Sequence, residues 1–239
     1  MDAVEALGAR GGTTCLVGAG GKKTTMRTLA SRTEAVVTTT VRIPIFDSWV
    51  ERVVVTDDPV GAAGRATERP LGVVPERERE DRYRGYDTSA VDRLARAIDD
   101  PLVVKADGAR TRLLKAPDDH EPQVPASADT VVPVASVRAV GRPLTEEHVH
   151  RVDRVAALTG RAPGEELRAV DVAAVLASDR GGLKGVPEGA TAVPLVNMVD
   201  DDRLAATARA VARAVHERAD VPRVVLAEMR AADPVVEVV

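Results

Sequence analysis

Short runs of small aliphatic residues alternate with helical patterns along the chain, and this alternation restricts the possible folds more than any other feature. The expected strands cover residues 13–18, 34–40, 52–58, 101–108, 129–136, 191–198 and 222–229. The expected helices cover residues 23–32, 89–98, 145–160, 169–178 and 200–220. Strands that alternate with helices indicate a parallel sheet with helices on both faces. We therefore expect an α/β fold.

The pattern shows no clear linker and no internal repeat, so we expect residues 1–239 to form a single α/β domain. Within it, residues 138–190 are expected to be mainly helical and could form a small lobe. The helix expected at 145–160 has a threonine at its start, acidic residues in its first turn and a glycine at its end, which are helix start and stop signals. Residues 59–85 are rich in Gly, Pro and Arg, and we expect a loop there apart from a short strand in LGVVP.

The composition excludes several classes of protein. Aromatic residues make up 2% of the chain, too few for the stacking platforms of single-stranded nucleic-acid binders. The net charge is −4 and no long basic run is present, so we expect no nucleic-acid partner. The single cysteine, Cys15, excludes an internal disulfide and a cysteine-based zinc site. No apolar run reaches the length of a membrane span and the N-terminus does not resemble a signal peptide, so we expect a cytoplasmic protein with no membrane partner.

A glycine-rich turn joins the first expected strand to the first expected helix, in the sequence VGAGGKKTTM of residues 17–26. At such a junction the N–H groups of the turn and of the first helical turn converge on one point and bind an anion. Glycine lets the chain approach a phosphate closely, and a lysine at the end of the turn can reach the terminal phosphates. The expected nucleotide-binding residues are Gly18, Ala19, Gly20, Gly21, Lys22, Lys23, Thr24 and Thr25.

The spacing of this turn leaves two registers open. Gly18 to Lys22 spells GxxGK, which resembles the short phosphate loop of the Mur-ligase class. The next residue is Lys23, where a Ser or Thr hydroxyl would normally contact Mg²⁺. Either Lys22 binds the phosphates and Thr24 supplies the hydroxyl, or Lys23 and Thr24 are the working pair; we favour Lys22. The structural alternative is an ordinary strand–helix turn whose glycines allow tight packing.

A second polar segment, VVKADGARTRLLKAPDDHEP, covers residues 103–122. Asp107 ends an apolar strand, where a carboxylate in nucleotide-binding α/β proteins holds Mg²⁺. Alternatively, the Asp-Gly pair marks only a turn. The dense polar loop that follows could bind a phosphate or carboxylate of a substrate, or it could simply be solvated. Its cationic side chains are Arg110, Arg112 and Lys115, and His120 lies near its end.

Three threonines, residues 38–40, end the second expected strand. Because α/β proteins bind ligands at the carboxyl ends of their strands, Thr39 and Thr40 are candidate substrate contacts, although threonine is common in strands. The histidines do not indicate a metal site. His148 and His150 lie two residues apart on an expected helix and therefore do not face each other.

The segment Asn197-Met198-Val199-Asp200 closes the strand expected at 191–198 and resembles the NKxD signature that reads guanine. Asn197 and Asp200 are therefore candidate contacts to a nucleotide base, although Met198 stands in the lysine position. The alternative is helix capping, because Asn-x-x-Asp before a helix is a common start signature. The bound nucleotide is expected to be Mg-ATP or Mg-GTP.

Five segments, in this order, resemble the YqeC-type family: GAGGKKTT, VVTTTVRIP, ADGARTRLLKAPDDHEP, AVGRPLTEEHVHR and PLVNMVD. The resemblance runs from about residue 13 to about residue 230. Members of that family are described as selenium cofactor biosynthesis proteins, or as accessory proteins of selenium-dependent molybdenum hydroxylases.

The resemblance implies a nucleotide loop at residues 18–24 and an acidic strand end at Asp107. It also implies a set of family motif positions, which we take as candidate substrate contacts: Lys115, His120, His150 and Arg151. Two positions depart from the family pattern. Lys105 stands where the family often has Glu, and Lys23 stands in the Thr position.

Three functions fit these features. The chain could be an enzyme-like P-loop NTPase that uses phosphoryl transfer or NTP hydrolysis in selenium or molybdenum cofactor maturation, with Lys22, Mg²⁺ and Asp107 stabilising charge. It could instead be a non-catalytic, nucleotide-gated chaperone whose partner is a selenium-dependent molybdenum hydroxylase or its maturation factors. A Rossmann-like dinucleotide binder fits less well, because GxGxxG would need a glycine in place of Lys23.

Overall fold

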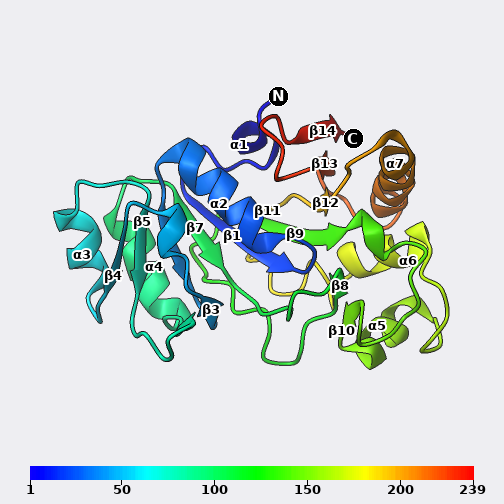
Figure 1. Cartoon of the computed structure of the whole chain (residues 1–239), viewed down its shortest axis with the longest axis horizontal. Coiled ribbons are helices and arrows are strands. Elements are labelled where there is room, and N and C mark those ends of the chain that lie inside the picture. Colours follow the sequence, from blue (N-terminus) through cyan, green and yellow to red (C-terminus); the bar gives the residue numbers. More distant parts are fainter.

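The computed structural model describes all 239 residues, and its central feature is a sheet of ten strands (Figure 1). The strands are β1 (Thr13–Gly18), β2 (Val36–Thr39), β4 (Arg52–Val55), β5 (Leu71–Val74), β7 (Leu102–Lys105), β9 (Thr130–Ser136), β11 (Thr191–Ala192), β12 (Leu195–Asn197), β13 (Val225–Ala227) and β14 (Val235–Val238). Their order is β14-β13-β12-β9-β1-β7-β2-β5-β4, and β11 pairs with β9 beside this path. Every pairing is parallel except that of β13 with β14.

The helices and two small ribbons complete the fold. The helices are α1 (Ala3–Ala6), α2 (Lys22–Thr33), α3 (Pro59–Arg65), α4 (Thr88–Ala97), α5 (Val152–Thr159), α6 (Ala169–Leu176) and α7 (Asp202–His216), with short 3₁₀ helices at Asp47–Trp49 and Val137–Ala139. One ribbon pairs β3 (Ile43–Pro44) with β6 (Arg82–Tyr83), and the other pairs β8 (Leu114–Lys115) with β10 (Val149–His150). None of the helices is both long and apolar enough to cross a membrane.

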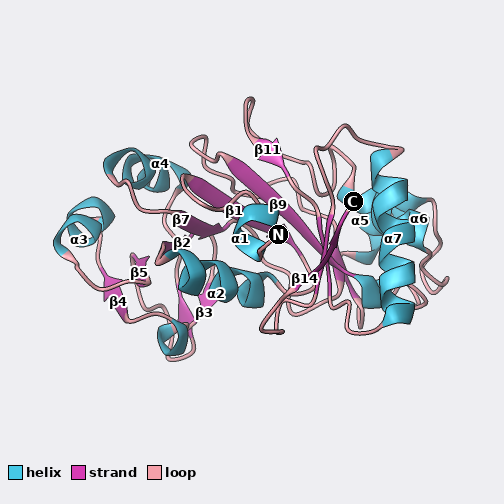
Figure 2. Cartoon of the chain, turned by 90° about the horizontal axis from the view of Figure 1, so that it is seen from above, coloured by secondary structure: helices cyan, strands magenta, loops and turns pink.

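Helices cover both faces of the sheet (Figure 2). On one face, α1 and α2 pack over a core that includes Leu16 of β1. On the other face, α3 and α4 cover one half of the sheet, and α5, α6 and α7 cover the other half. Central strands buried on both faces need continuous apolar runs, which is why Val-rich segments form them. The expected α/β fold, with a mostly parallel sheet flanked by helices, is confirmed.

The expectation of a helix over residues 145–160 is wrong for the first part of this range, because α5 begins only at Val152. Arg151 precedes it in a left-handed conformation, with φ of 67°. The strand β10 lies where the first turns of the helix were expected, and it pairs with β8 from a distant part of the chain. This long-range pairing overrides the local helix signal. His148 and His150 therefore do not lie on a helix.

The segment 59–85, expected to be a loop with one strand, contains α3 and β6 as well as β5. The start of α3 follows ordinary helix chemistry: the Asp58 carboxylate accepts a hydrogen bond from Gly61 N–H at 2.9 Å, and Pro59 is the first helical residue. These signals are visible in the sequence. The high content of Gly and Arg around them obscured a helix of less than two full turns.

The late part of the chain also differs in detail from the expectation. The strand expected at 191–198 is two strands, β11 and β12, separated by Val193 and Pro194; proline has no N–H to donate to a neighbouring strand. The last helix begins at Asp202, and the Asp201 carboxylate accepts a hydrogen bond from Leu204 N–H at 2.7 Å. The N-cap of α7 is thus Asp201 and not Asp200.

Candidate functional site

The candidate site lies at the carboxyl edge of the sheet, around the strand in its middle. β1 runs between β9 and β7, and the glycine turn leads directly from β1 into α2. Because the strands are parallel, the segments that follow β2, β7, β9 and β12 reach this same edge. This is the edge at which α/β sheets bind ligands.

The glycine turn has a backbone conformation that suits glycine. Gly18, Gly20 and Gly21 have φ angles of 86°, 85° and 131°. A Cβ atom at Gly18 would collide with the main chain of Val134, and one at Gly20 would collide with the main chain of Ser136. The turn is therefore packed closely against β9 in a conformation that other residues adopt only with strain.

The N–H groups of the turn fall into two sets. Three are used inside the chain: Gly18 N–H donates to Asp107 Oδ2 at 2.9 Å, Ala19 N–H to Val134 O at 2.8 Å, and Gly20 N–H to Arg112 O at 2.9 Å. The next four, from residues 21–24, have no acceptor in the chain, and no side chain caps α2. These four free donors stand at the positive end of a twelve-residue helix. The N–H groups available to an anion are therefore those of the first turn of α2.

Lys22 is the first residue of α2, and its side chain is turned inward. Its Nζ lies 2.7 Å from Asp107 Oδ1 and donates a hydrogen bond to Gly18 O. Burial lowers the pKa of Lys22, and the Asp107 carboxylate opposes this effect. Lys23, in contrast, is exposed. Its exposure favours Lys22 as the lysine of the site, although which lysine contacts a phosphate stays a prediction.

The hydroxyls of the two threonines after these lysines differ in burial and in hydrogen bonding. The Thr25 hydroxyl is buried and donates to Gly21 O at 3.2 Å within the helix. The Thr24 hydroxyl is half-buried and has no partner in the chain. Thr24 is thus the first-turn hydroxyl that could reach a metal ion.

Asp107 joins the glycine turn to β7. Its Oδ2 accepts the hydrogen bond from Gly18 N–H and lies 2.9 Å from Lys115 Nζ, whereas Oδ1 contacts only Lys22. The residue is 1% exposed. No three side chains of His, Cys, Asp or Glu are grouped to hold a metal ion. However, Mg²⁺ bound with a nucleotide needs only one or two protein carboxylates, so the metal role of Asp107 and Thr24 stays a prediction.

An ion-pair network extends the site toward β8 and β10. Lys115 Nζ lies 2.5 Å from Glu121 Oε2, and the Arg151 guanidinium lies 2.6 Å from the same oxygen. Burial tends to raise the pKa of Glu121, but hydrogen bonds from Arg151 and Lys115 outweigh it and lower that pKa to about 2. The fold therefore brings Lys115 and Arg151, two of the family motif positions, into contact with a third residue, Glu121. Glu121 is not among the site residues expected from the sequence, and its place within the HEP segment is the one signal that could have found it.

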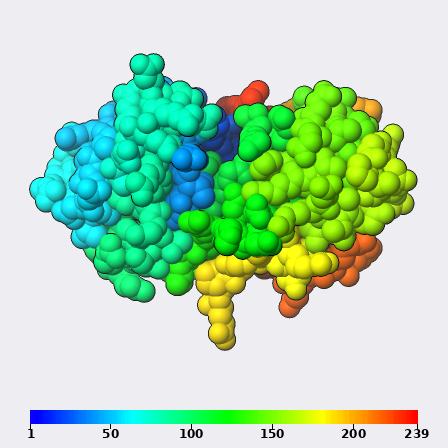
Figure 3. All heavy atoms as spheres, turned by 90° about the horizontal axis from the view of Figure 1, so that it is seen from below, coloured from blue at the N-terminus to red at the C-terminus, as the bar shows by residue number.

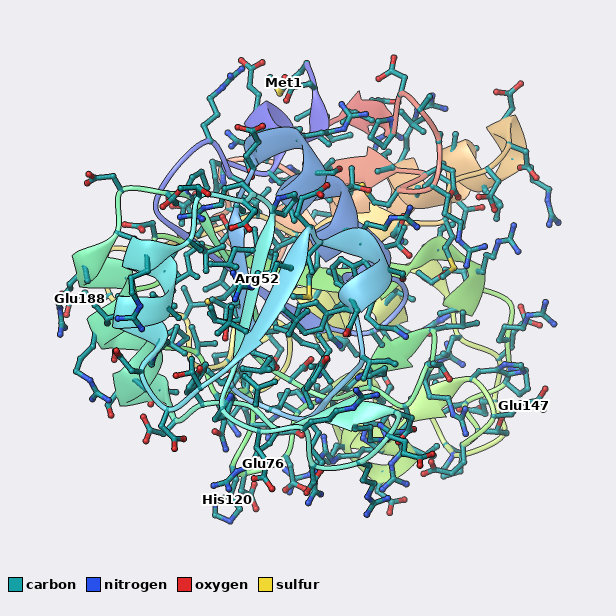
Figure 4. The ribbon with its side chains drawn as sticks, turned by 60° about the vertical axis from the view of Figure 1, so that its left-hand side comes forward. Met1, Arg52, Glu76, His120, Glu147 and Glu188 are labelled. Atoms are coloured by element: carbon teal, nitrogen blue, oxygen red, sulfur yellow. The ribbon has the colours of Figure 1, made fainter.

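The remaining candidate substrate residues of this region, His150, His120 and Arg110, lie nearer the surface. His150 is half-buried, and burial together with the charges of Arg151 and Lys115 lowers its pKa. His120 is exposed, and its side chain projects outward at the periphery of the molecule (Figure 4). Arg110 is also exposed, in a left-handed conformation with φ of 45°. The structure thus does not bring His120 or Arg110 into contact with the buried network.

The threonines at the end of β2 are buried, and their hydroxyls bind the main chain. The Thr39 hydroxyl lies 2.7 Å from Val41 O and 3.0 Å from Lys105 O, and Thr40 donates to Gln123 O at 2.7 Å. These bonds fix the end of β2 to β7 and to the loop that follows it. A substrate contact by either hydroxyl stays a prediction, which would require one of these bonds to be shared.

Asn197 has a structural contact that the sequence did not reveal. Its Nδ2 donates to Gly20 O at 2.9 Å, and its Oδ1 accepts from Met229 N–H at 3.1 Å. The side chain is 3% exposed. Asn197 therefore ties the glycine turn to the segment after β13, whatever else it contacts.

Asp200 lies on the surface and faces other charged groups. It forms a salt bridge with Arg138. Hydrogen bonding to Glu228 and to Arg138 lowers the pKa of Asp200, whereas burial and the nearby Asp200 carboxylate raise the pKa of Glu228. Contact of Asp200 with a nucleotide base stays a prediction.

A cavity of about 540 Å³ adjoins the site on the β2 side. It is lined by Thr40, Val41, Arg42, Glu76, Glu78, Arg84 and Gly85. Two ion pairs border it: the Arg42 guanidinium binds both oxygens of Glu78, and Arg84 lies 3.2 Å from Glu76. Seen from below, the molecule is hollowed near its centre, between the teal and the green segments (Figure 3), whereas the residues that line the cavity all belong to the blue-to-teal part of the chain. The cavity lies at the end of β2, next to Arg42, whose carbonyl accepts the hydrogen bond from Lys105.

Comparisons with known proteins identify a family. The family model described as YqeC protein matches residues 14–153, more than half of the chain. The chain is similar to the protein named "Uncharacterized protein YqeC" of Escherichia coli strain K12, with 31% identity over 191 residues that cover 76% of this chain and 74% of that protein. No solved structure matches the chain. The family match includes the glycine turn, Asp107, Lys115 and Arg151.

Proposed function

The chain belongs to the YqeC family, and from this premise we propose that it is a P-loop-like accessory protein that binds Mg-ATP or Mg-GTP at residues 18–25. One observation carries this proposal: four N–H groups without acceptors stand at the start of α2, directly beside the buried pair of Lys22 and Asp107. Helix N-termini with free amides bind phosphate groups. A neighbouring lysine adds the charge that distinguishes a phosphate loop from a simple strand–helix turn.

The residues present suit a magnesium nucleotide. Mg²⁺, when bound, would neutralise charge on the phosphate oxygens, and Thr24 and Asp107 are the residues that would hold it. Lys22 would turn from Gly18 O toward a phosphate, since a lysine side chain has a flexible stem. Asp107 would keep its bond to Gly18 N–H, which holds the turn in place.

For the pathway, we propose a role in selenium or molybdenum cofactor maturation of a hydroxylase, as the sequence resemblance implies. Two forms of this role differ in chemistry. In the first, the protein transfers a phosphoryl group or hydrolyses NTP. In the second, it is a chaperone that the bound nucleotide gates. Release of phosphate by the purified protein alone would support the first form, and tight nucleotide binding without turnover would support the second.

The lysine of the turn provides the direct test of nucleotide binding. If Lys22 contacts the phosphates, Lys22→Ala should weaken Mg-nucleotide binding by about 1.5–3 kcal/mol, the range for a hydrogen bond to a charged group. Lys23→Ala serves as the matched control and should change affinity much less. Isothermal titration with Mg-ATP and Mg-GTP measures both.

Because Lys22 also pairs with buried Asp107, a thermal melt of each variant must accompany the titration. A folded Lys22→Ala protein that binds as tightly as the wild type would reject Lys22 as the phosphate lysine. Weaker binding in Lys23→Ala alone would show that the other register is correct. If neither change affects binding, or the wild type binds no nucleotide, the proposed function is wrong.

A further inference from the structure

Lys105 is a buried lysine without a counterion. It is 5% exposed, and no carboxylate oxygen lies within 4 Å of its Nζ. Its hydrogen-bond partner is a neutral main-chain group, the carbonyl of Arg42, at 2.7 Å. Lysine is almost never fully buried unless it is paired, so this position calls for an explanation.

The ammonium group of Lys105 lies at the same edge of the sheet as the glycine turn. In register, Lys105 is level with Leu16 of β1 and Thr39 of β2, inside the sheet. Its Nζ nevertheless reaches the Arg42 carbonyl, which lies beyond the end of β2. Asp107 lies two residues beyond Lys105, the last residue of β7. Since residues two apart in an extended segment share a face, the two side chains extend on the same side. The side chain therefore runs along this face up to the edge of the sheet.

The cluster around Lys105 carries more positive than negative charge. Lys22, Lys105 and Lys115 are buried, and the carboxylates among them are Asp107 and the half-buried Glu121, which Arg151 also contacts. Burying an unpaired charge costs free energy, and an apolar side chain at this position would avoid the cost. An anionic ligand would supply the missing counter-charge.

We propose that Lys105 binds the terminal phosphate of the nucleotide held at residues 18–25, so that the site prefers a nucleoside triphosphate to a diphosphate. This inference rests on the proposed function. The free amides of α2 bind the phosphate chain at one end of the cluster. Lys105 lies at the other end, toward β2, and binds the terminal phosphate. The cavity lined by Thr40 and Arg42 lies on that same side.

The experiment compares two nucleotides in three proteins. Affinities for Mg-ATP and Mg-ADP, and for Mg-GTP and Mg-GDP, are measured by isothermal titration in the wild type, in Lys105→Met and in Lys184→Met. Methionine matches the lysine side chain up to Cε and removes the ammonium group with its charge. In Lys105→Met the ratio of triphosphate to diphosphate affinity should fall about tenfold or more, as expected for one charged hydrogen bond, with diphosphate affinity unchanged. Lys184, which binds main-chain carbonyls of Asp118 and Asp119, is the control and should keep the wild-type ratio.

The melting temperature without nucleotide separates ligand recognition from a structural role. If Lys105 serves a ligand, Lys105→Met should melt at a higher temperature than the wild type, because an unbalanced charge has been removed. If Lys105 serves only to hold the Arg42 carbonyl, the variant should melt lower and keep the wild-type ratio, and the inference is then overturned. Lys105→Gln, which retains a donor, is measured in parallel in case the methionine variant does not fold. Absence of any nucleotide binding in the wild type would refute the proposed function itself, whereas an unchanged ratio would refute only the role of Lys105.

Discussion

At the scale of single residues, Asp107 is the side chain on which most contacts of the site converge. It accepts a hydrogen bond from Gly18 N–H and contacts the ammonium groups of Lys22 and Lys115. A carboxylate placed in this way could act in two manners. It could anchor the glycine turn, or it could act on a nucleotide through Mg²⁺. Because only the second role depends on the metal, the two can be separated by experiment.

We predict that Asp107→Asn weakens nucleotide binding in Mg²⁺ by about 1.5–3 kcal/mol, the range for an interaction with a charged group. Binding measured in EDTA should remain unchanged or become tighter, because asparagine keeps an oxygen for Gly18 N–H but removes a negative charge near the phosphates. Fluorescence titration under both conditions provides the measurement. Asp119→Asn, at an exposed carboxylate paired with Arg154, is the control. An equal loss with and without Mg²⁺ would leave Asp107 with an anchoring role alone.

The sequence predicted part of this site at the residue scale. Asp107 was expected at the end of a strand next to the glycine turn, and it lies 2.7 Å from Lys22. The contact of Asn197 with Gly20 was not foreseen, since these residues are 177 positions apart and meet only through the strand order. Glu121 was missed for the same reason, because its partner Arg151 comes from a segment expected to be helical. Contacts of this kind depend on pairings that one sequence does not specify.

At the scale of elements, the glycine turn is defined by how closely it packs against β9. Gly20 has a positive φ angle, and its Cα faces the main chain at Ser136. Gly108, in the neighbouring loop, has open space where a Cβ would stand and no positive φ. The two glycines therefore form a matched pair for comparison: the backbone requires a glycine at residue 20 but not at residue 108.

We predict that Gly20→Ala lowers the free energy of unfolding by about 2 kcal/mol or more, from backbone strain together with the collision at Ser136. Because the turn leads into α2, nucleotide binding should weaken as well. Gly108→Ala should change stability by less than about 0.5 kcal/mol. Urea unfolding followed by circular dichroism gives both values. A similar small effect at both positions would mean that the turn can move away from β9.

Elements were predictable where their pattern is local and long enough. Central parallel strands are largely apolar on both faces, so β1, β7 and β9 were evident as short runs that contain Val or Leu. The strands β3, β6, β8 and β10 have two residues each, and they exist only through pairing with a partner. No periodic pattern can mark so short a strand. The same pairing, of β10 with β8, explains why the helix expected at 145–160 begins late.

At the scale of the whole molecule, one sheet connects the early and the late parts of the chain. β1 lies between β7 and β9, so both halves meet at the glycine turn. Hydrogen bonds also join segments near the N-terminus to segments near the C-terminus. Arg223 donates to Ala6 O at 2.6 Å, and Thr28 of α2 donates to Met229 O at 3.0 Å. This arrangement leads us to propose that the chain is a single folding unit, as the sequence analysis expects.

We predict that the protein unfolds in urea as one cooperative transition. Trp49, the single tryptophan, packs on Phe46 with ring centroids 5.2 Å apart and reports on the part of the sheet near β4 and β5. Circular dichroism reports on all helices, among which α5, α6 and α7 cover the opposite half. Tryptophan fluorescence and circular dichroism should therefore give the same midpoint, the standard test of two-state unfolding. If residues 138–190 formed an independent lobe, helical signal would be lost at a urea concentration where the fluorescence of Trp49 is still native. That result would replace the single unit with two, and the measured midpoints would give the stability of each.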